Sequence, residues 1–231
     1  MGSGGGSPAQ RLKLVLFLLS ALAIFAGMYV VYAALNTLRT LDAVEAERDT
    51  WQRPADVLRA LDLKEGNTVV DLGSGAGYFT LKISPVIGPR GRVIAVDLRG
   101  LSLTFLWIRA ALRTPHNIEV MVGQEEDPRL PAGTVDAVLI ANTYHEFRNP
   151  HAIIDHVFRA LRPGGRLVIV DRGPRPSETR TPNGVAHSHD VPMEAVTREL
   201  QHDGFEIIHR ENPFIDRPGD DPWWLLASRK P

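Results

Sequence analysis

Hydrophobic positions divide the chain into an N-terminal apolar run and a longer region of short apolar segments. Residues 14–35 read LVLFLLSALAIFAGMYVVYAAL and contain no charged side chain. At a rise of about 1.5 Å per residue, about 22 helical residues cover the roughly 30 Å hydrocarbon core of a bilayer. The pattern predicts a transmembrane helix over residues 12–35. A cleaved secretory signal and a buried helix of a soluble protein are the alternatives. Val31, Tyr32 and Ala33 resemble a cleavage site, although signal peptides usually carry a shorter apolar run.

Polar segments flank this helix on both sides. Residues 1–11 are rich in Gly and Ser and are expected to be disordered. Residues 36–53 are polar, with Leu38, Leu41 and Val44 at helical spacing, which predicts a helical stalk. Because positive residues stand at both ends of the apolar run, charge counting leaves the orientation in a membrane open.

Short apolar segments recur after residue 54 in a pattern typical of an α/β domain. A short helix is predicted at 54–61, and the β-branched run TVVDL at 68–72 predicts a buried strand that ends at a glycine loop. Buried strands separated by helices predict a Rossmann-like, doubly wound and mostly parallel sheet, with ligands at the carboxyl ends of its strands. Two later apolar runs are joined by a polar loop and suit an antiparallel hairpin. The further predicted strands are 92–97, 118–122, 135–141, 167–171, 205–210 and 223–229.

Composition narrows the possible functions. The chain has 231 residues, so residues 54–231 are the size of one domain with one core. The formal net charge is −1, without the basic excess that nucleic-acid binding usually brings, so no nucleic-acid partner is expected. There is no cysteine, which excludes disulfides, thiolate metal sites and a cysteine nucleophile.

A glycine-rich loop follows the first predicted strand. It reads DLGSGAGYFT over residues 71–80 and has the pattern D-x-G-x-G-x-G. Glycines let the backbone approach a ligand closely, and the N–H groups of the following helix can donate to it. The dinucleotide fingerprint needs a glycine where Tyr78 stands, and the Gly-Lys-Ser/Thr of a phosphate-binding P-loop is absent. Asp97 ends the second strand, where a carboxylate can accept hydrogen bonds from ribose hydroxyls.

Four sequence blocks resemble the class I S-adenosylmethionine-dependent methyltransferases. They are VVDLGSGAGYFT (69–80), VIAVD (93–97), VGQEEDPRLPAGTVDAVLIANTYHEF (122–147) and LRPGGRLVIVD (161–171). The chain is similar to the ubiquinone- and menaquinone-biosynthesis type, and the resemblance covers roughly residues 51–229. It implies S-adenosylmethionine as the cofactor and a seven-stranded sheet with a C-terminal antiparallel hairpin.

The resemblance also implies roles for individual residues. The glycine loop would surround the methionine part of the cofactor, Asp97 would hold the ribose, and Asn142 would lie near the sulfonium. The family usually has Asp where this chain has Gln124, although an amide can still donate and accept toward adenine. The cofactor-binding set implied is Asp71, Gly73, Ser74, Gly75, Gly77, Asp97, Gln124, Glu125 and Asn142.

The segment NTYHEF at 142–147 supplies the candidate catalytic side chains. Methyl transfer depends on alignment of the acceptor, and a base is needed only if the acceptor arrives protonated. His145 is the candidate base because it follows the fourth strand at the binding edge. Tyr144 is a second candidate, as a residue that shapes the pocket. Local packing or capping by His145 is the alternative.

A second histidine cluster lies in the Gly- and Pro-rich loop 172–191. His187, His189 and Asp190 would overhang the pocket there. They are too few for a closed metal site, so no metal is predicted, and substrate contact, proton transfer and a solvated loop remain open.

The sequence thus predicts an S-adenosylmethionine-dependent methyltransferase that acts on a small or lipidic acceptor near a membrane. A nucleotide-cofactor oxidoreductase on a similar sheet and a catalytically inactive, cofactor-binding membrane subunit are the alternatives. The absence of cysteine argues against the arsenic methyltransferases, which use thiolates. Because the cofactor is made in the cytosol, a single-pass membrane protein with a cytoplasmic domain is expected. The methylated atom and the oligomeric state stay open.

Overall fold

The computed structural model describes residues 7–174 and 191–231. The chain forms two compact units, Met1–Glu47 and Arg48–Pro231. The predicted histidine cluster at residues 187–190 and the first six residues of the N-terminal tail lie outside the described residues.

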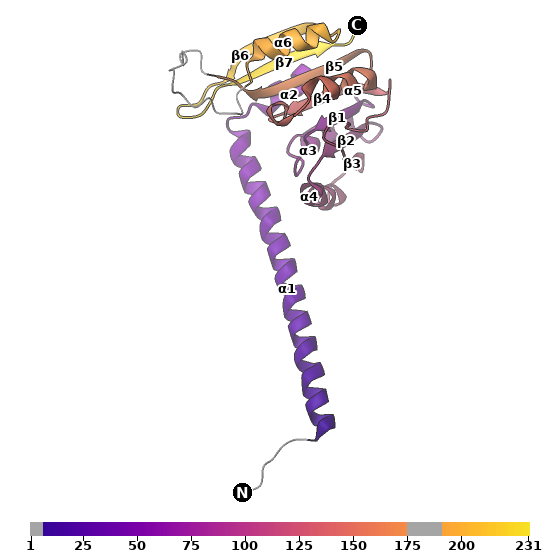
Figure 1. The fold of residues 1–231 in the computed structure, drawn as a ribbon, viewed down its shortest axis with the longest axis vertical. Coiled ribbons are helices and arrows are strands. Elements are labelled where there is room, and N and C mark those ends of the chain that lie inside the picture. The colour runs from indigo at the N-terminus through magenta and orange to yellow at the C-terminus, as the bar shows by residue number, and fades with distance from the viewer. Residues whose placement is uncertain (1–6, 175–190) are drawn as a thin grey trace. The chain divides into compact units, whose positions relative to one another are not determined.

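The described part of the first unit is helical. Helix α1 (Pro8–Asp49) covers the predicted span and most of the predicted stalk without a break (Figure 1). Among the described helices it alone is long and apolar enough to cross a membrane. Its start differs from the expected disordered tail, because residues 8–11 are helical. The backbone N–H of Ser7 donates to Gln10 Oε1 at 2.9 Å and that of Gln10 donates to Ser7 Oγ at 3.3 Å, which forms a capping box.

The second unit contains a seven-stranded sheet in the order β3-β2-β1-β4-β5-β7-β6. The neighbours from β3 through β5 run parallel, whereas β7 is antiparallel to both β5 and β6. This confirms the predicted Rossmann-like sheet with a C-terminal antiparallel hairpin. The strands are β1 (Thr68–Leu72), β2 (Arg92–Asp97), β3 (Ile118–Val122), β4 (Val135–Ala141), β5 (Leu161–Arg172), β6 (Glu206–Ile215) and β7 (Trp223–Arg229).

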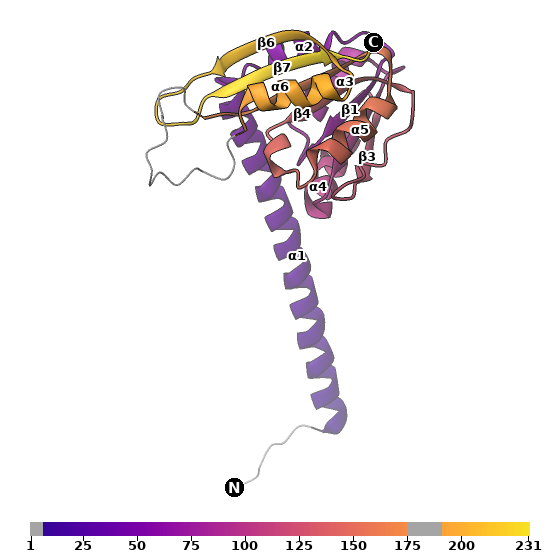
Figure 2. The same cartoon turned by 45° about the horizontal axis from the view of Figure 1, so that its top comes forward.

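Helices cover both faces of the sheet (Figures 1 and 2). One face packs against α5 and α6, and the other packs against α2 and α3, while α4 lies on β2 and β3. Trp224 and Trp223 are buried on opposite faces, as core residues. The helices are α2 (Pro54–Leu61), α3 (Thr80–Ile87), α4 (Gly100–Ala111), the 3-10 turn η1 (Tyr144–Glu146), α5 (Pro150–Ala160) and α6 (Met193–His202).

Two strands are longer than their apolar runs predict. Strand β5 begins at Leu161, which pairs with Val135, and its register then shifts so that Arg166 pairs with Ala137. Strand β6 continues to Ile215, which pairs with Trp223 across a second irregularity. In both cases pairing with a neighbouring strand extends a segment whose own sequence is polar or contains Gly and Pro.

The strand order reverses between β1 and β4. From β1 the chain winds outward to β2 and β3, and then returns to β4 on the other side of β1. Open parallel sheets bind ligands beyond the carboxyl ends of the strands at such a reversal. The glycine loop after β1, the acid at the end of β2 and the segment after β4 therefore meet at one edge.

Candidate active site

The glycine loop is held in a conformation that favours glycine. Gly73, Gly75 and Gly77 have φ angles of +82°, +54° and +96°, in the left-handed region. A Cβ at Gly73 would lie 2.2 Å from Thr143 Oγ1, so this loop and the segment after β4 approach closely only because residue 73 has no side chain. The backbone N–H groups of Gly73 and Ser74 both donate to the carbonyl of Val96. The loop after β1 is thereby fixed against β2.

Asp97 joins three segments at the pocket. Its carboxylate accepts from the backbone N–H of Gly75 at 2.8 Å and from that of Arg99 at 2.8 Å, and the Arg99 Nε lies at 3.3 Å. The residue is only 5% exposed. The predicted ribose-binding acid is therefore ordered by the glycine loop and by the residue that leads into α4.

Asp71 is a buried carboxyl group behind the glycine loop. It accepts from Thr80 Oγ1 at 2.5 Å, from the first residue of α3. Burial raises the pKa of the Asp71 carboxyl to about 6, against the lowering effect of its hydrogen bonds with Thr80. The nearby charge of Asp97 acts in the same direction as burial. Asp71 therefore supports the loop from beneath.

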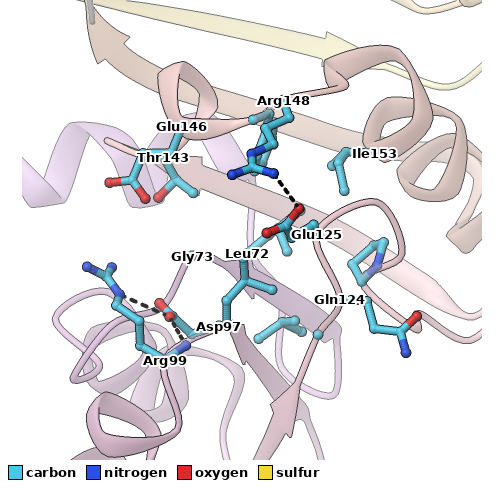
Figure 3. A pocket seen from close by; sticks show the side chains of 15 residues that line it. Leu72, Gly73, Asp97, Arg99, Gln124, Glu125, Thr143, Glu146, Arg148 and Ile153 are labelled. Carbon is cyan, nitrogen blue, oxygen red and sulfur yellow. Dashed lines mark hydrogen bonds and ion pairs between the residues drawn. The ribbon is translucent and has the colours of Figure 1, made fainter.

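A pocket opens at the carboxyl ends of β1, β2 and β4, and four of the predicted cofactor-binding residues line it. They are Gly73, Asp97, Gln124 and Glu125 (Figure 3). Its other walls combine apolar side chains with ion pairs that Figure 3 shows as dashed lines. The remaining lining residues are Leu72, Val96, Leu98, Arg99, Gly123, Pro128, Thr143, Glu146, Phe147, Arg148 and Ile153.

Two predicted binding residues lie just behind the pocket wall with unused polar atoms. Within the described residues, Ser74 Oγ and Asn142 Oδ1 are buried and have no hydrogen-bond partner. Asn142 has a φ of +55°, and its backbone N–H donates to Val170. Buried polar atoms are normally paired, so these two indicate that a ligand completes the site. They fit the amino-acid part of S-adenosylmethionine, which carries both donors and acceptors.

Opposite charges meet at the side of the pocket predicted to hold adenine. Arg148 Nη1 lies 3.2 Å from Glu125 Oε2, and both side chains are mostly exposed. Gln124 lines the pocket next to Glu125, and its backbone N–H donates to the carbonyl of Asp127. Exposed ion pairs of this kind add little stability. The pair instead sets the position of two charged groups at the pocket mouth.

His145 does not line the pocket but lies directly beside a residue that does. Its Nδ1 is 2.8 Å from Asp171 Oδ1, and its backbone N–H donates to Asp171 Oδ2 at 3.2 Å. The side chains of His145 and Asp171 are 4% and 0% exposed. His145 Nε2 lies 4.0 Å from Glu146 Oε1, and Glu146 lines the pocket. Asp171 therefore fixes the imidazole ring through Nδ1 and leaves Nε2 on the side of Glu146.

Tyr144 is buried in the core, away from the pocket lining. Its hydroxyl donates to Glu199 on α6, and its ring packs at 5.6 Å from Phe147. Burial and the neighbouring Glu199 raise the pKa of the Tyr144 hydroxyl far above its ordinary value, which keeps it protonated. This geometry gives Tyr144 a packing role behind the pocket, through Phe147.

Four residues at or beside the pocket were not predicted from the sequence. Asp171 is the last residue but one of β5, and Asp97 is the last residue of β2, so an acid near the carboxyl end of a strand at the binding edge is the signal that could have identified it. Arg99, Glu146 and Arg148 carry no sequence signal of their own, because their partners are set by the loops. Within 7–174 and 191–231 no group of three or more possible metal ligands occurs.

Comparison with known proteins agrees with this geometry. Residues 70–169 match a family described as a methyltransferase domain. The chain is 31% identical over 112 residues to the ubiquinone/menaquinone biosynthesis C-methyltransferase of Pasteurella multocida, a match that covers 47% of this chain and 41% of that protein. The arsenite methyltransferase of Halobacterium salinarum is 31% identical over 106 residues, which is 46% of this chain and 27% of that protein. The chain thus spans less than half the length of these curated relatives.

Solved structures share the fold. The crystal structure of a SAM-dependent methyltransferase from Aquifex aeolicus superposes with a TM-score of 0.66 at 23% identity. The superposition covers 83% of this chain and 97% of that one. Together with the domain match, this confirms the resemblance that the four motif blocks indicate.

Proposed function

We propose that this chain, as a class I S-adenosylmethionine-dependent methyltransferase, methylates a small or lipidic acceptor beside a membrane. The observation that carries the proposal is the pocket where Gly73 and Asp97 meet, with the unpartnered polar atoms of Ser74 and Asn142 behind its wall. The oxidoreductase alternative has no comparable support, since Tyr78 is a buried core residue where the dinucleotide fingerprint needs glycine.

The protein residues position the reactants. When bound, the cofactor supplies an electrophilic methyl group on a positively charged sulfur. Asp97 would hold the ribose hydroxyls of the cofactor. The loop from Asp71 to Gly77 would hold its amino-acid part, with Ser74 Oγ and Asn142 Oδ1 as hydrogen-bond partners, and Gln124 and Glu125 would hold the adenine. Exclusion of water and alignment of the acceptor then provide much of the rate enhancement.

His145 is proposed as the base for an acceptor that arrives protonated. Its Nε2 takes the acceptor proton, while Nδ1 is held by Asp171 at 2.8 Å. A buried carboxylate in this position orients the imidazole and stabilises the imidazolium that forms. Tyr144 contributes by packing, because its ring contacts Phe147 and so helps to position Phe147 in the pocket wall.

The acceptor is proposed to be apolar or lipidic. The relative from Pasteurella multocida is named for ubiquinone and menaquinone biosynthesis, which supports a quinone-like acceptor. Helix α1 is proposed to span the membrane once, with the catalytic unit in the cytoplasm where the cofactor is made.

The test uses the full chain in lipid nanodiscs. Calorimetric titration with S-adenosylmethionine, S-adenosylhomocysteine and NAD is expected to show micromolar binding of the first two only. Labelled methyl groups are then followed into a demethylated quinol, a phospholipid amine and a water-soluble phenol, with transfer expected to a membrane-dissolved acceptor. Binding without transfer to any acceptor would instead identify an inactive cofactor-binding subunit. Binding of NAD, or of nothing, would refute the cofactor assignment.

A further inference from the structure

Helix α4 presents an apolar face to the outside of the catalytic unit. Its inner face, with Leu103 and Leu106, is buried against Ala95 and Val120 of the sheet. On the outer face, large apolar side chains are 73% exposed at Leu101 and 63% exposed at Trp107. The α4 face consists of Leu98, Leu101, Phe105, Trp107, Ile108 and Leu112, which lie before, along and just after the helix.

The charge pattern around the α4 face is one-sided. Between Asp97 and Glu119 the sequence contains no acidic residue. Arg99 precedes the helix with a side chain that is 64% exposed, and the exposed Arg113 follows it. The third arginine, Arg109, is buried and donates to the carbonyl of Ala76, so it belongs to the fold. An apolar stripe with a tryptophan and basic residues at both ends is typical of helices that lie in the interface of an anionic bilayer.

The α4 face is continuous with the pocket. Leu98 and Arg99 line the pocket, and Gly100 begins α4 directly after them. Leu98 is itself 55% exposed and belongs to both surfaces. A surface seated on the α4 face would therefore border the pocket mouth.

We propose that the α4 face docks the catalytic unit onto an anionic lipid bilayer. The inference rests on the proposed membrane attachment, because a chain with a helix able to span a bilayer keeps its catalytic unit within reach of one. The apolar side chains of the α4 face suit the boundary of the acyl chains, and the arginines at its two ends suit the lipid phosphate groups. Trp107 suits the headgroup region. A docked catalytic unit then takes an apolar acceptor directly from the lipid.

The absence of cysteine makes the docking directly measurable. Thr104→Cys on the exposed side of α4 and Gln201→Cys on the exposed side of α6 each accept one environment-sensitive fluorophore. The two positions belong to helices that pack on opposite faces of the sheet. The full chain is reconstituted in nanodiscs that contain anionic phosphatidylglycerol and spin-labelled lipid as a quencher. We expect a blue shift and quenching at position 104 and neither at position 201.

Each failure has its own signature. If the chain fails to float with vesicles after alkaline washing, the membrane attachment is wrong, and the docking inference falls with it. If it floats but the label at position 104 stays exposed to water, the docking inference alone is wrong. A blue shift without quenching by the spin-labelled lipid would mean that protein, such as a second copy of the chain, covers α4, which also overturns the inference.

An activity measurement provides a second readout. Trp107→Ser removes the largest side chain of the α4 face, and Trp107 is not one of the residues that line the pocket. With a membrane-dissolved acceptor we expect kcat/KM to fall about tenfold, since burial of a large apolar side chain is lost. With a water-soluble acceptor of the same chemistry, kcat/KM should be unchanged. A parallel loss for both acceptors would show a structural role instead.

Discussion

Asp97 is tied to both the glycine loop and Arg99, and its carboxylate is the group expected to hold the cofactor ribose. Asp97→Ala should weaken S-adenosylmethionine binding by about 10- to 100-fold, because hydrogen bonds to a charged group contribute about 1.5–3 kcal/mol. His145→Ala should leave the affinity nearly unchanged, since His145 does not line the pocket. Calorimetry on both variants, with thermal unfolding as the control for folding, measures the difference. Equal losses would contradict the two roles.

The buried Asp71 should make stability depend on pH. Its pKa rises from 3.8 to about 6 on folding, so between these values the native state holds a proton that the unfolded state has lost. The free energy of unfolding that Asp71 contributes therefore falls as pH rises through this window, by up to about 3 kcal/mol. The Asp71→Asn variant lacks this pH-dependent contribution to the free energy of unfolding, because an amide does not titrate in this range. The difference in unfolding free energy between wild type and Asp71→Asn, followed from pH 4 to 7, should show this slope; a constant difference would show that Asp71 is not perturbed by burial.

Asp171 is a positioning residue for His145. Asp171→Asn keeps an oxygen for the Nδ1 hydrogen bond and removes the charge that stabilises the imidazolium. For an acceptor that must lose a proton, we expect Asp171→Asn to lower kcat about 10- to 100-fold. This decrease should be smaller than the decrease in His145→Ala, and the affinity for the cofactor should be unchanged. For an acceptor that binds already deprotonated, kcat should be unchanged, because no proton has to be removed. A loss of the same size for both kinds of acceptor would leave His145 and Asp171 as packing residues.

The glycine loop and the segment after β4 pack together through one close approach, between Gly73 and Thr143. Gly73→Ala places a Cβ 2.2 Å from Thr143 Oγ1 at a φ of +82°, whereas Gly75→Ala meets open space at a φ of +54°. Left-handed backbone costs a non-glycine residue about 1–2 kcal/mol, and overpacking adds about 1–3 kcal/mol. Gly73→Ala should therefore lower the free energy of unfolding more than Gly75→Ala in denaturant titrations. The second substitution Thr143→Gly should restore part of the Gly73→Ala loss, and no recovery would argue against the clash.

The same elements show what the sequence could predict. The bounds of β1 to β4 and of β7 follow from apolar runs, because strands buried on both faces need little else to define them. The extensions of β5 and β6 depend on partners such as Val135 and Trp223, which no local pattern contains. Likewise the pairing of His145 with Asp171 joins residues 26 positions apart, so it becomes visible only once β4 and β5 lie side by side.

The proposed membrane topology can be tested by protease accessibility. With the catalytic unit in the cytoplasm, protease added to intact cells should leave residues 48–231 uncleaved, whereas protease added to inside-out vesicles should digest them. A tag placed after Pro231 reports both conditions on immunoblots, with a known cytoplasmic protein as the control for leakage. Digestion in intact cells would place the catalytic unit outside and would require the cofactor to be supplied there.

Strand β7 is the last strand in chain order and yet lies inside the sheet, between β5 and β6. During synthesis on the ribosome, the parallel strands emerge first, and the edge of β5 stays unpaired until β7 has been made. An open strand edge is a template for pairing with other chains, so nascent and truncated forms are vulnerable to aggregation at this position. If α1 is inserted in a membrane by then, neighbouring nascent chains are confined to one surface, which makes prompt chaperone protection of β5 important for the yield of this protein.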